Sequence, residues 1–251
     1  MSGIHQITYR VRPYEAGYQA KAKLDTLLNY LQDAAYEHSV SRGFSALDLF
    51  RRGLTWVLSR YHITIRRYPE AGQQVTVRTW YPGPQKPFYL RDWEVVGDAG
   101  DVLALATSSW LILDLATMKP VDDNGLLDGL KPRPVRALDD PFHPLPGLEA
   151  PHAEARFMVR LSDTDLNRHV NHVHYIQWAV ESVSRLAAGG MVPLEVEAGY
   201  RAEARFEDNV TARAQDLGEG LFHHQLLRDG DQKELTRLRT RWGIPEDRAA
   251  T

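Results

Sequence analysis

The two ends of this 251-residue chain carry the same pattern of residues, and this internal repeat constrains the fold more than any other feature. The segment "VRPYEAGYQAKAKLDTLLNYLQD", which begins at Val11, aligns without a gap with "VRLSDTDLNRHVNHVHYIQWAVE", which begins at Val159. The offset of 148 residues places Glu15 opposite Asp163. Because self-similarity at a fixed offset indicates repeated structural units, the chain is expected to contain two copies of one fold.

Each copy shows the same order of expected elements. In the first copy, a strand at 7–12 and a helix at 24–42 precede strands at 54–67, 74–81, 88–97 and 103–113. In the second, a strand at 155–161 and a helix at 171–188 precede strands at 195–206, 210–216, 221–228 and 234–242. Helical spacing of apolar residues and strand-like alternation support these assignments. We therefore expect an α+β tandem (double) hotdog, with two long helices each wrapped by a curved antiparallel sheet, and the two sheets joined into one.

A proline- and glycine-rich segment separates the copies. It reads "DLATMKPVDDNGLLDGLKPRPVRALDDPFHPLPGLEA" and has little periodicity, which is typical of a connection. Such a long connection is unusual inside a compact domain, so it indicates a boundary. We predict an N-terminal hotdog at 1–113, a linker at 114–152 and a C-terminal hotdog at 153–251.

Composition excludes several classes of protein. No run approaches the roughly 18 apolar residues of a membrane span, and "MSGIHQITYRVRPYE" lacks the apolar centre of a signal peptide, so a cytoplasmic protein is expected. The chain has no cysteine, which excludes disulfides, a thiolate nucleophile and a zinc-thiolate site. A net charge of -3 gives no general attraction to nucleic acid or anionic lipid.

A polar cluster within "LSDTDLNRHVNHVHYIQW", residues 161–178, occurs in one copy only. At the positions of Asp165, Asn167 and His169, the first copy carries Gly17, Gln19 and Lys21. If the polar residues served folding alone, both copies would need them. Alternate residues of an extended segment point to one side, so we expect these three side chains to converge on a functional site.

Helix capping and metal binding are two other interpretations of the cluster. Helix capping explains Asn171, a plausible N-cap, but not the alternating residues before it. A metal site would need His169, His172 and His174 to face one ion, and their spacing across a strand-to-helix junction does not allow this without a special turn. We therefore expect no metal, and we interpret His172 and His174 as a solvated or partly buried helix face.

The sequence also resembles a known family. The segment "SDTDLNRHVNHVHYIQWAVES" resembles the signature of the acyl-ACP thioesterases, tandem-hotdog enzymes that end fatty-acid synthesis in plastids and in bacteria. In the first copy, "LLNYLQDAAYEHSVSRGFS", "LTWVLSRYHITIRRYPEAGQQVTVRTW" and "RDWEVVGDAGDVLALATSSWLIL" resemble the family's helix, its Trp-Val strand and its Arg-Asp-Trp strand. The resemblance covers nearly the whole chain and is to the bacterial type.

The resemblance implies a set of catalytic residues in the second copy. The family's catalytic aspartate, asparagine and histidine match Asp165, Asn167 and His169. A second family motif matches "YRAEA", which implies Glu203 as the catalytic carboxylate and leaves Ala204 where many members have cysteine. Because no cysteine is present, a thiol mechanism is excluded for this chain.

The implied reaction is hydrolysis of an acyl-ACP thioester by activated water. Either Glu203 or His169 would take the proton from water, with Asp165 orienting the imidazole, and Asn167 would hold the water or the carbonyl oxygen. Backbone N–H groups at the helix start would stabilise the oxyanion, at Asn171 and His172. Neither a metal nor an organic cofactor is needed.

The carboxylate, like the polar cluster, is expected in one copy only. An offset of 138 residues, which pairs Tyr68 with Phe206, places Ile65 opposite Glu203. The N-terminal half would then lack every catalytic group and be available for the acyl chain, while the C-terminal half would be catalytic.

Candidate acyl-pocket residues lie on the helix and a strand of the N-terminal half, although they would also serve as ordinary core. They are Leu24, Leu27, Leu28, Leu31, Trp56 and Leu58. In the C-terminal half, Tyr175 and Trp178 are interpreted as packing of the helix on the sheet.

The expected partner is acyl carrier protein as the acyl thioester substrate, with no nucleic acid and no membrane span, and a homodimer is left open. The candidate basic residues for contact with an acidic carrier are Arg237, Arg239 and Arg241 on the last strand; Arg66 and Arg67; and Lys131, Arg133 and Arg136. Such residues are most often solvated, so no carrier site is assigned.

Three other functions are alternatives to acyl-ACP hydrolysis. An acyl-CoA thioesterase would share every catalytic residue, and a hydratase of related fold fits the polar pattern less well. A non-catalytic acyl-thioester-binding protein would be expected to carry a DNA-binding module, and no such pattern is visible. The preferred acyl chain stays open.

Overall fold

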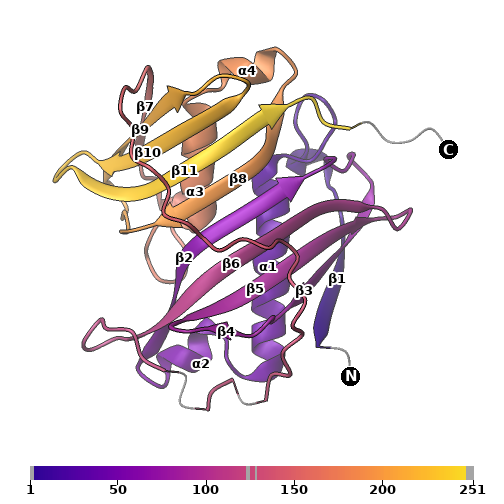
Figure 1. Cartoon of the computed structure of the whole chain (residues 1–251), viewed down its shortest axis with the longest axis vertical. Coiled ribbons are helices and arrows are strands. Elements are labelled where there is room, and N and C mark those ends of the chain that lie inside the picture. Colours follow the sequence, from indigo (N-terminus) through magenta and orange to yellow (C-terminus); the bar gives the residue numbers. More distant parts are fainter. Residues whose placement is uncertain (1–2, 123–124, 128, 247–251) are drawn as a thin grey trace. The chain divides into compact units, whose positions relative to one another are not determined.

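The computed structural model describes residues 3–122, 125–127 and 129–246 (Figure 1). The chain divides into two compact units, one formed by Met1–Ile63 and Tyr68–Pro141, the other by Thr64–Arg67 and Phe142–Thr251. The main division falls inside the predicted linker, of which residues 123–124 and 128 lie outside the described residues.

The first unit contains one long helix and an antiparallel sheet. Its elements are β1 (Ile4–Arg10), a 3-10 turn (Pro13–Glu15), α1 (Leu24–Arg42), α2 (Ala46–Phe50), β2 (Leu54–Ile65), β3 (Gln74–Trp80), β4 (Pro84–Gln85), β5 (Phe88–Gly97) and β6 (Val102–Asp114). The main strands lie in the order β1-β3-β5-β6-β2, and β4 pairs with β5. Helix α1 has the predicted bounds, and it ends at Gly43 because this residue adopts a left-handed conformation with φ of 76°.

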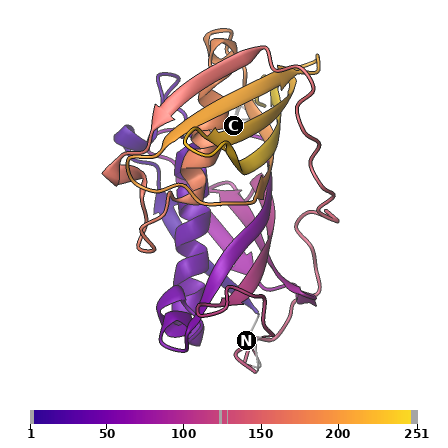
Figure 2. The ribbon, with the colours of Figure 1, turned by 90° about the vertical axis from the view of Figure 1, so that its left-hand side faces the viewer.

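The second unit repeats this plan. Its elements are β7 (Ala153–Met158), a 3-10 turn (Leu161–Asp163), α3 (His172–Glu181), α4 (Arg185–Ala188), β8 (Val192–Tyr200), β9 (Asn209–Asp216), β10 (Leu221–Arg228) and β11 (Lys233–Gly243). The strands lie in the order β8-β11-β10-β9-β7. In each unit the long helix therefore follows the first strand and packs against the sheet, as Figures 1 and 2 show.

The helix of each unit buries one face against its own sheet. In α1, Leu27, Leu28 and Leu31 are fully buried, and the indole of Trp93 on β5 donates a hydrogen bond of 2.9 Å to the carbonyl of Leu31. In α3, the buried ring of Trp178 stacks on Phe157 of β7. These contacts supply the apolar area that stabilises each unit.

Two of the expected elements that end earlier than the sequence predicted lie in the second unit and differ most from their expected bounds. The helix predicted at 171–188 is interrupted after Glu181, where the hydroxyl of Ser182 donates a 2.6 Å hydrogen bond to the carbonyl of Ala179. Such local bonding competes with regular helix. The strand predicted at 195–206 ends at Tyr200, so Glu203 lies in an irregular segment after β8 and not in a strand.

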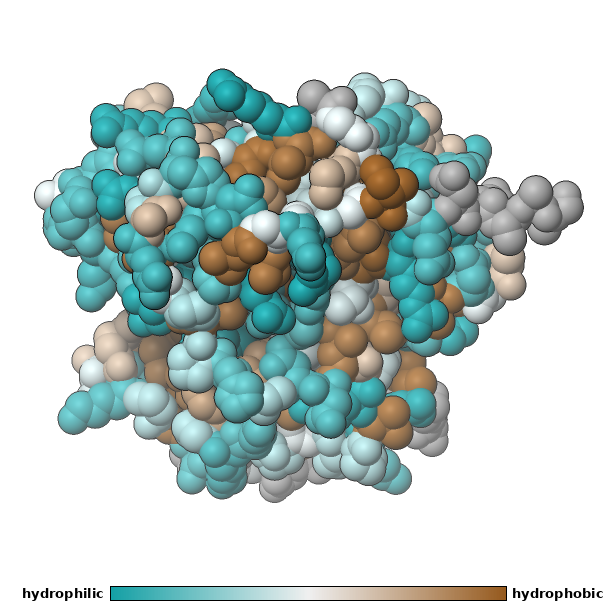
Figure 3. Space-filling model, turned by 45° about the horizontal axis from the view of Figure 1, so that its top comes forward, coloured by the Kyte–Doolittle hydropathy of each residue, from teal (hydrophilic) through white to brown (hydrophobic). Residues whose placement is uncertain are grey.

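The surface is mainly hydrophilic on the face that Figure 3 draws. Hydrophobic residues form several smaller groups there. Among the described residues, none of the helices is long and apolar enough to span a membrane.

A buried histidine in the second unit predicts a pH-dependent stability. His224 is fully buried, its Nε2 lies 2.8 Å from the hydroxyl of Thr240, and burial lowers its pKa to about 3. In the unfolded chain this histidine has an ordinary pKa near 6.5, so below that pH the unfolded state binds a proton and the folded state does not. The free energy of unfolding is therefore highest above pH 6.5 and decreases as the pH is lowered. Between pH 7 and pH 5 this group is expected to lower the free energy of unfolding by about 2 kcal/mol.

Urea unfolding at the two pH values tests this expectation. The variant His224→Gln should lose that part of the pH dependence, whereas His143→Gln, at an exposed position, should keep it. If His224→Gln retains the full wild-type difference, buried His224 is not its source.

Candidate active site

The predicted catalytic cluster lies on a tight loop between the 3-10 turn of the second unit and helix α3. The loop is closed by a bridge between Thr164 and Val170, and the backbone N–H of Asp165 donates to the carbonyl of His169 at 2.9 Å. Arg168, at the tip, adopts a left-handed conformation with φ of 61°. The prediction of an extended segment is therefore wrong here: the residues form a turn, and alternation alone does not place them on one side.

The structure brings one pair of predicted catalytic side chains into contact. Nδ1 of His169 lies 3.1 Å from Oε2 of Glu203, with the histidine side chain 26% exposed and the glutamate 52% exposed. The two residues come from different segments, the loop before α3 and the irregular segment after β8. The pair is both close enough for proton exchange and open to water.

Asp165 makes a contact other than the expected one with His169, and its predicted catalytic role stays a prediction. Its carboxylate accepts the backbone N–H of Asn167 at 2.8 Å, which is an Asx-turn that shapes the loop. The imidazole of His169 instead faces Glu203, whose carboxylate lies within contact distance of Nδ1. Asn167 is exposed at the loop tip, where its amide can reach a bound substrate.

The first copy builds the same loop without the polar side chains. There, the N–H of Gly17 donates to the carbonyl of Lys21 at 2.8 Å, as Asp165 does to His169, and the N–H of Ala20 donates to Gly17. Ala20 has φ of 56°, close to that of its counterpart Arg168. Because glycine, glutamine and lysine support this backbone equally, the loop itself does not require aspartate, asparagine and histidine. This favours a functional role for the polar residues.

Of the two backbone N–H groups predicted to stabilise the oxyanion at the start of α3, that of Asn171 already has a partner within the protein. Asn171 is the N-cap, and its side chain accepts the N–H of Val173 at 3.0 Å. Its own N–H donates to the carbonyl of Asp163 at 2.9 Å, so it is engaged within the protein and is not an oxyanion donor. That the N–H of His172 donates to the oxyanion stays a prediction. The imidazole of His172 packs edge-on against Tyr200, and burial lowers its pKa to about 4.

The counterpart of Glu203 in the first copy differs from the predicted Ile65. The carbonyl of Pro69 accepts from Ala22 at 2.8 Å, just as that of Ala204 accepts from Val170 at 3.0 Å. These matching bonds align Pro69 with Ala204, an offset of 135 residues. With this offset, the residue opposite Glu203 is Tyr68. The 138-residue offset used for the sequence was three residues too long at this point, and it therefore placed Ile65 there. The first copy still carries no carboxylate at this position.

Two residues that contact the Glu203 segment were missed or misread in the sequence. The hydroxyl of Tyr175 accepts the N–H of Ala204 at 2.8 Å, and Nη1 of Arg228 donates to the carbonyl of Glu203 at 2.9 Å. The repeat held a signal for Tyr175, since the aligned residue in the first copy is Leu27 and only one copy has a hydroxyl. The residue-by-residue alignment of the two segments ends before Arg228, so the comparison of the copies in sequence did not mark this residue.

The predicted acyl-pocket residues belong to the first unit. Leu27, Leu28 and Leu31 are fully buried, whereas Leu24, Trp56 and Leu58 are partly buried. The indole of Trp56 donates a 3.0 Å hydrogen bond to the carbonyl of Phe44. These contacts are those of a packed core, and the acyl-pocket assignment stays a prediction.

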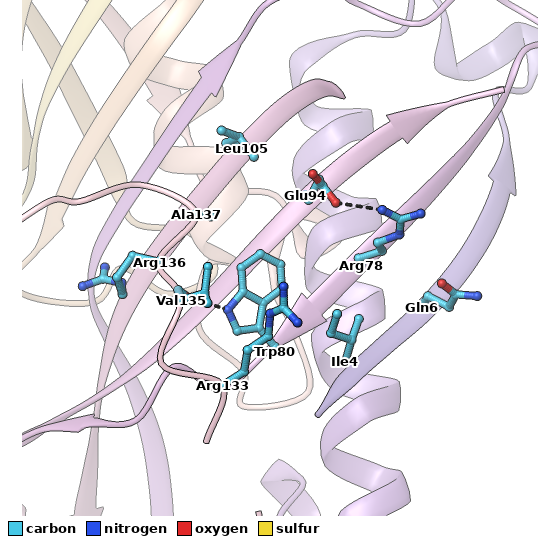
Figure 4. Close-up of a pocket in the computed structure, with 10 residues that line it drawn as sticks. All are labelled: Ile4, Gln6, Arg78, Trp80, Glu94, Leu105, Arg133, Val135, Arg136 and Ala137. Carbon is cyan, nitrogen blue, oxygen red and sulfur yellow. Dashed lines mark hydrogen bonds and ion pairs between the residues drawn. The ribbon is translucent and has the colours of Figure 1, made fainter. Parts of the chain in front are cut away.

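A cavity of about 600 Å³ lies in the first unit and is polar in character (Figure 4). Within it, Arg78 forms a 3.0 Å ion pair with Glu94, and the guanidinium of Arg133 lies 5.6 Å from the ring centre of Trp80. The indole of Trp80 donates to the carbonyl of Val135 at 2.7 Å. The cavity is therefore partly closed by the linker, and its charges are largely matched.

The arginine row on the last strand is also matched by acidic residues. Arg239 contacts Glu197, Arg241 lies 3.5 Å from Glu195, and Arg237 contacts Glu234. A row of paired charges offers little net attraction to an acidic carrier, so it remains unassigned.

Two protein-family models match the chain. The acyl-ACP thioesterase N-terminal domain matches residues 3–123, and the acyl-ACP thioesterase C-terminal domain matches residues 149–243. A palmitoyl-acyl carrier protein thioesterase of Gossypium hirsutum is 32% identical, over 93% of this chain and 62% of the relative. An oleoyl-acyl carrier protein thioesterase of Arabidopsis thaliana is 29% identical, over 92% of this chain and 74% of the relative. The chain thus spans about three fifths of the length of the Gossypium relative.

Solved structures are similar over almost the whole chain. An acyl-ACP thioesterase from Bacteroides thetaiotaomicron has a TM-score of 0.87 and 24% identity, covering 96% of this chain and 98% of that structure. A 12:0-ACP thioesterase from Umbellularia californica has the same TM-score and identity, covering 97% and 98%. This similarity confirms the predicted tandem hotdog fold.

Proposed function

The chain belongs to the acyl-ACP thioesterase family, and on that premise we propose that it hydrolyses the thioester of acyl-[acyl-carrier protein], releasing a free fatty acid and the carrier thiol. The observation that carries this proposal is the contact between His169 and Glu203, at 3.1 Å, in the one copy that has both groups. A solvent-accessible imidazole paired with a carboxylate is the arrangement that general-base activation of water requires.

The geometry favours His169 as the base and Glu203 as its partner. Nδ1 of the imidazole faces the carboxylate, so Nε2 is the nitrogen that takes the proton from water. The hydroxide attacks the thioester carbon, and the tetrahedral intermediate collapses with expulsion of the thiolate, which receives the proton from the imidazolium. The Glu203 carboxylate stabilises the imidazolium while it exists.

Two further parts of the site support the reaction. The amide of Asn167 and the backbone N–H of His172 are the donors proposed for the carbonyl oxygen. Asp165 holds the loop through the N–H of Asn167 and so orients that amide. None of these steps uses a metal or an organic cofactor.

The division of labour between the units is part of the proposal. The first unit, predicted at 1–113, would accept the acyl chain, and the unit predicted at 153–251 would hold the catalytic groups. The support is the repeat itself, because Gly17, Gln19 and Lys21 leave the first loop without catalytic side chains. The cytoplasmic location and the homodimer stay predictions.

Hydrolysis assays with matched acyl-ACP and acyl-CoA of several chain lengths test the proposal. Wild type is expected to release fatty acid from acyl-ACP faster than from acyl-CoA, and His169→Ala should lower that rate by about 10³-fold. Lys21→Ala, on the equivalent loop of the first copy, is the matched control and should keep the wild-type rate. Cleavage of acyl-CoA alone would support the acyl-CoA alternative, and cleavage of neither would refute thioester hydrolysis.

A further inference from the structure

We propose that Tyr175 and Arg228 are positioning residues, which clamp the peptide between Glu203 and Ala204 and thereby hold the Glu203 carboxylate against His169. The expected effect on kcat rests on the proposed function. The expected effect on the position of the Glu203 carboxylate rests on the hydrogen bonds of this peptide alone.

The two side chains hold opposite ends of one peptide unit. Tyr175 Oη accepts the N–H of Ala204 at 2.8 Å, and Arg228 Nη1 donates to the carbonyl of Glu203 at 2.9 Å. That N–H and that carbonyl belong to the same planar group, so the plane cannot rotate without breaking at least one bond. Glu203 projects from this plane, and a rotation would move its carboxylate relative to the imidazole.

The segment needs such a clamp because it has left the sheet. Strand β8 ends at Tyr200, and the N–H groups of Arg201 and Ala202 both donate to the carbonyl of Leu235. Beyond this point no strand ladder among the described residues supplies partners for the Glu203–Ala204 peptide, although Ala204 is fully buried. Buried backbone groups require hydrogen bonds, and here side chains provide them.

The repeat shows that the clamp accompanies the carboxylate. Tyr175 aligns with Leu27, and Ala204 with Pro69, which has no N–H to satisfy. Arg228 aligns with Gly97 because the two residues occupy the same place in the strand registers. Arg228 pairs with Val210, which pairs with Phe157, and Gly97 pairs with Val75, which pairs with Tyr9. The copy without a catalytic carboxylate therefore lacks both clamping side chains and the N–H that one of them binds.

Arg228 is well suited to hold a carbonyl. Its guanidinium binds both carboxylate oxygens of Asp231, at 3.0 and 2.7 Å, and lies 3.9 Å from Asp208. The guanidinium is always protonated in a protein, and the hydrogen bonds to Asp231 raise the pKa of Arg228 further above its usual range. Charge-assisted hydrogen bonds are stronger than neutral ones, and the fork geometry also fixes the direction of the guanidinium.

Steady-state kinetics on acyl-ACP test the arginine arm of the clamp. Arg228→Met is expected to lower kcat by about tenfold with KM changed less than about twofold, and Arg228→Lys, which keeps a cationic donor, should restore part of the loss. Arg213→Met is the matched control, since Arg213 on β9 forms its ion pair with the exposed Glu154. Equal kcat in Arg228→Met and wild type would overturn the proposal for this residue.

A double-mutant cycle tests the tyrosine arm. Tyr175→Phe is expected to lower kcat by about tenfold because the N–H of Ala204 loses its acceptor. Ala204→Pro removes that N–H and reproduces the residue of the first copy, so adding Tyr175→Phe to Ala204→Pro should cost little further activity. If the two effects are simply additive, Tyr175 does not act through the Ala204 N–H.

A structural readout separates the clamp from the proposed reaction. In crystals of Arg228→Met and Tyr175→Phe, the distance between His169 Nδ1 and Glu203 Oε2 is expected to exceed the wild-type value of 3.1 Å, and exchange of the Ala204 amide should accelerate in Tyr175→Phe. If wild type hydrolyses no thioester, the proposed function fails but these measurements still decide the clamp. Unchanged geometry in both variants would refute it even if stability falls.

Discussion

Glu203→Gln is expected to lower kcat on acyl-ACP by about 10³-fold, with little change in KM. Glutamine keeps the size of the side chain and an oxygen that can accept from Nδ1 of His169, which the carboxylate meets at 3.1 Å. It removes the negative charge that stabilises the imidazolium formed when water is deprotonated. The loss therefore concerns the reacting state more than substrate binding, which is why kcat should fall and KM should not.

Steady-state rates with purified acyl-ACP measure this effect. Glu207→Gln is the matched control, because Glu207 is an exposed glutamate in the same connection and its N–H bond to Val159 does not involve the side chain. The control is expected to stay within about twofold of wild type. A Glu203→Gln rate within tenfold of wild type would remove Glu203 from the catalytic machinery, and Asp165 would then be the next carboxylate to examine.

Most of the fold was predictable from the sequence because the repeat reinforces weak local signals. The bounds of α1, β5 and β10 agree with the prediction, since each is a periodic segment closed by a glycine or a polar turn. The least accurate element was the strand expected at 195–206, which ends at Tyr200. Its last residues alternate like a strand, and only the bonds of Arg201 and Ala202 to a single carbonyl show that the ladder has stopped.

The candidate site was predictable as a list of residues but not as an arrangement. Comparing the copies picks out Asp165, Asn167 and His169, since a side chain kept in one copy alone is not needed for the shared backbone. The sequence does not show that the loop is a turn, because its left-handed residue is Arg168 and not a glycine. The pairing of His169 with Glu203 depends on a tertiary contact that no local pattern encodes.

The linker makes contacts that its proline- and glycine-rich composition does not predict. Proline and glycine suggest a passive connection, yet residues 133–137 dock on the first unit. The N–H of Arg133 donates to the carbonyl of Tyr81 at 2.9 Å, and that of Ala137 donates to the carboxylate of Asp92 at 2.6 Å. Asp92 is fully buried, and burial raises its pKa. A buried carboxylate of this kind depends on its partners, and one of them is the linker residue Arg136, at 3.2 Å.

Arg136→Met is therefore expected to lower the free energy of unfolding by about 3 kcal/mol at pH 7. Methionine keeps much of the apolar stem but removes the cation that faces Asp92 and the 2.7 Å hydrogen bond to Thr107. Without the cation, the pKa of the Asp92 carboxyl rises further, so below that pKa the group is neutral and the penalty shrinks. The loss should consequently be smaller at pH 5 than at pH 7.

Urea unfolding of four proteins isolates the buried pair: wild type, Arg136→Met, Asp92→Asn and the double variant. In the Asp92→Asn background there is no charge to compensate, so Arg136→Met should cost at least 1 kcal/mol less than it does in wild type. Arg133→Met, which removes the contact of a guanidinium with the Trp80 ring, should cost about 1 kcal/mol or less. If Arg136→Met costs the same in both backgrounds, its contribution is packing alone; if it costs nothing in either, the linker does not stabilise the first unit through Asp92.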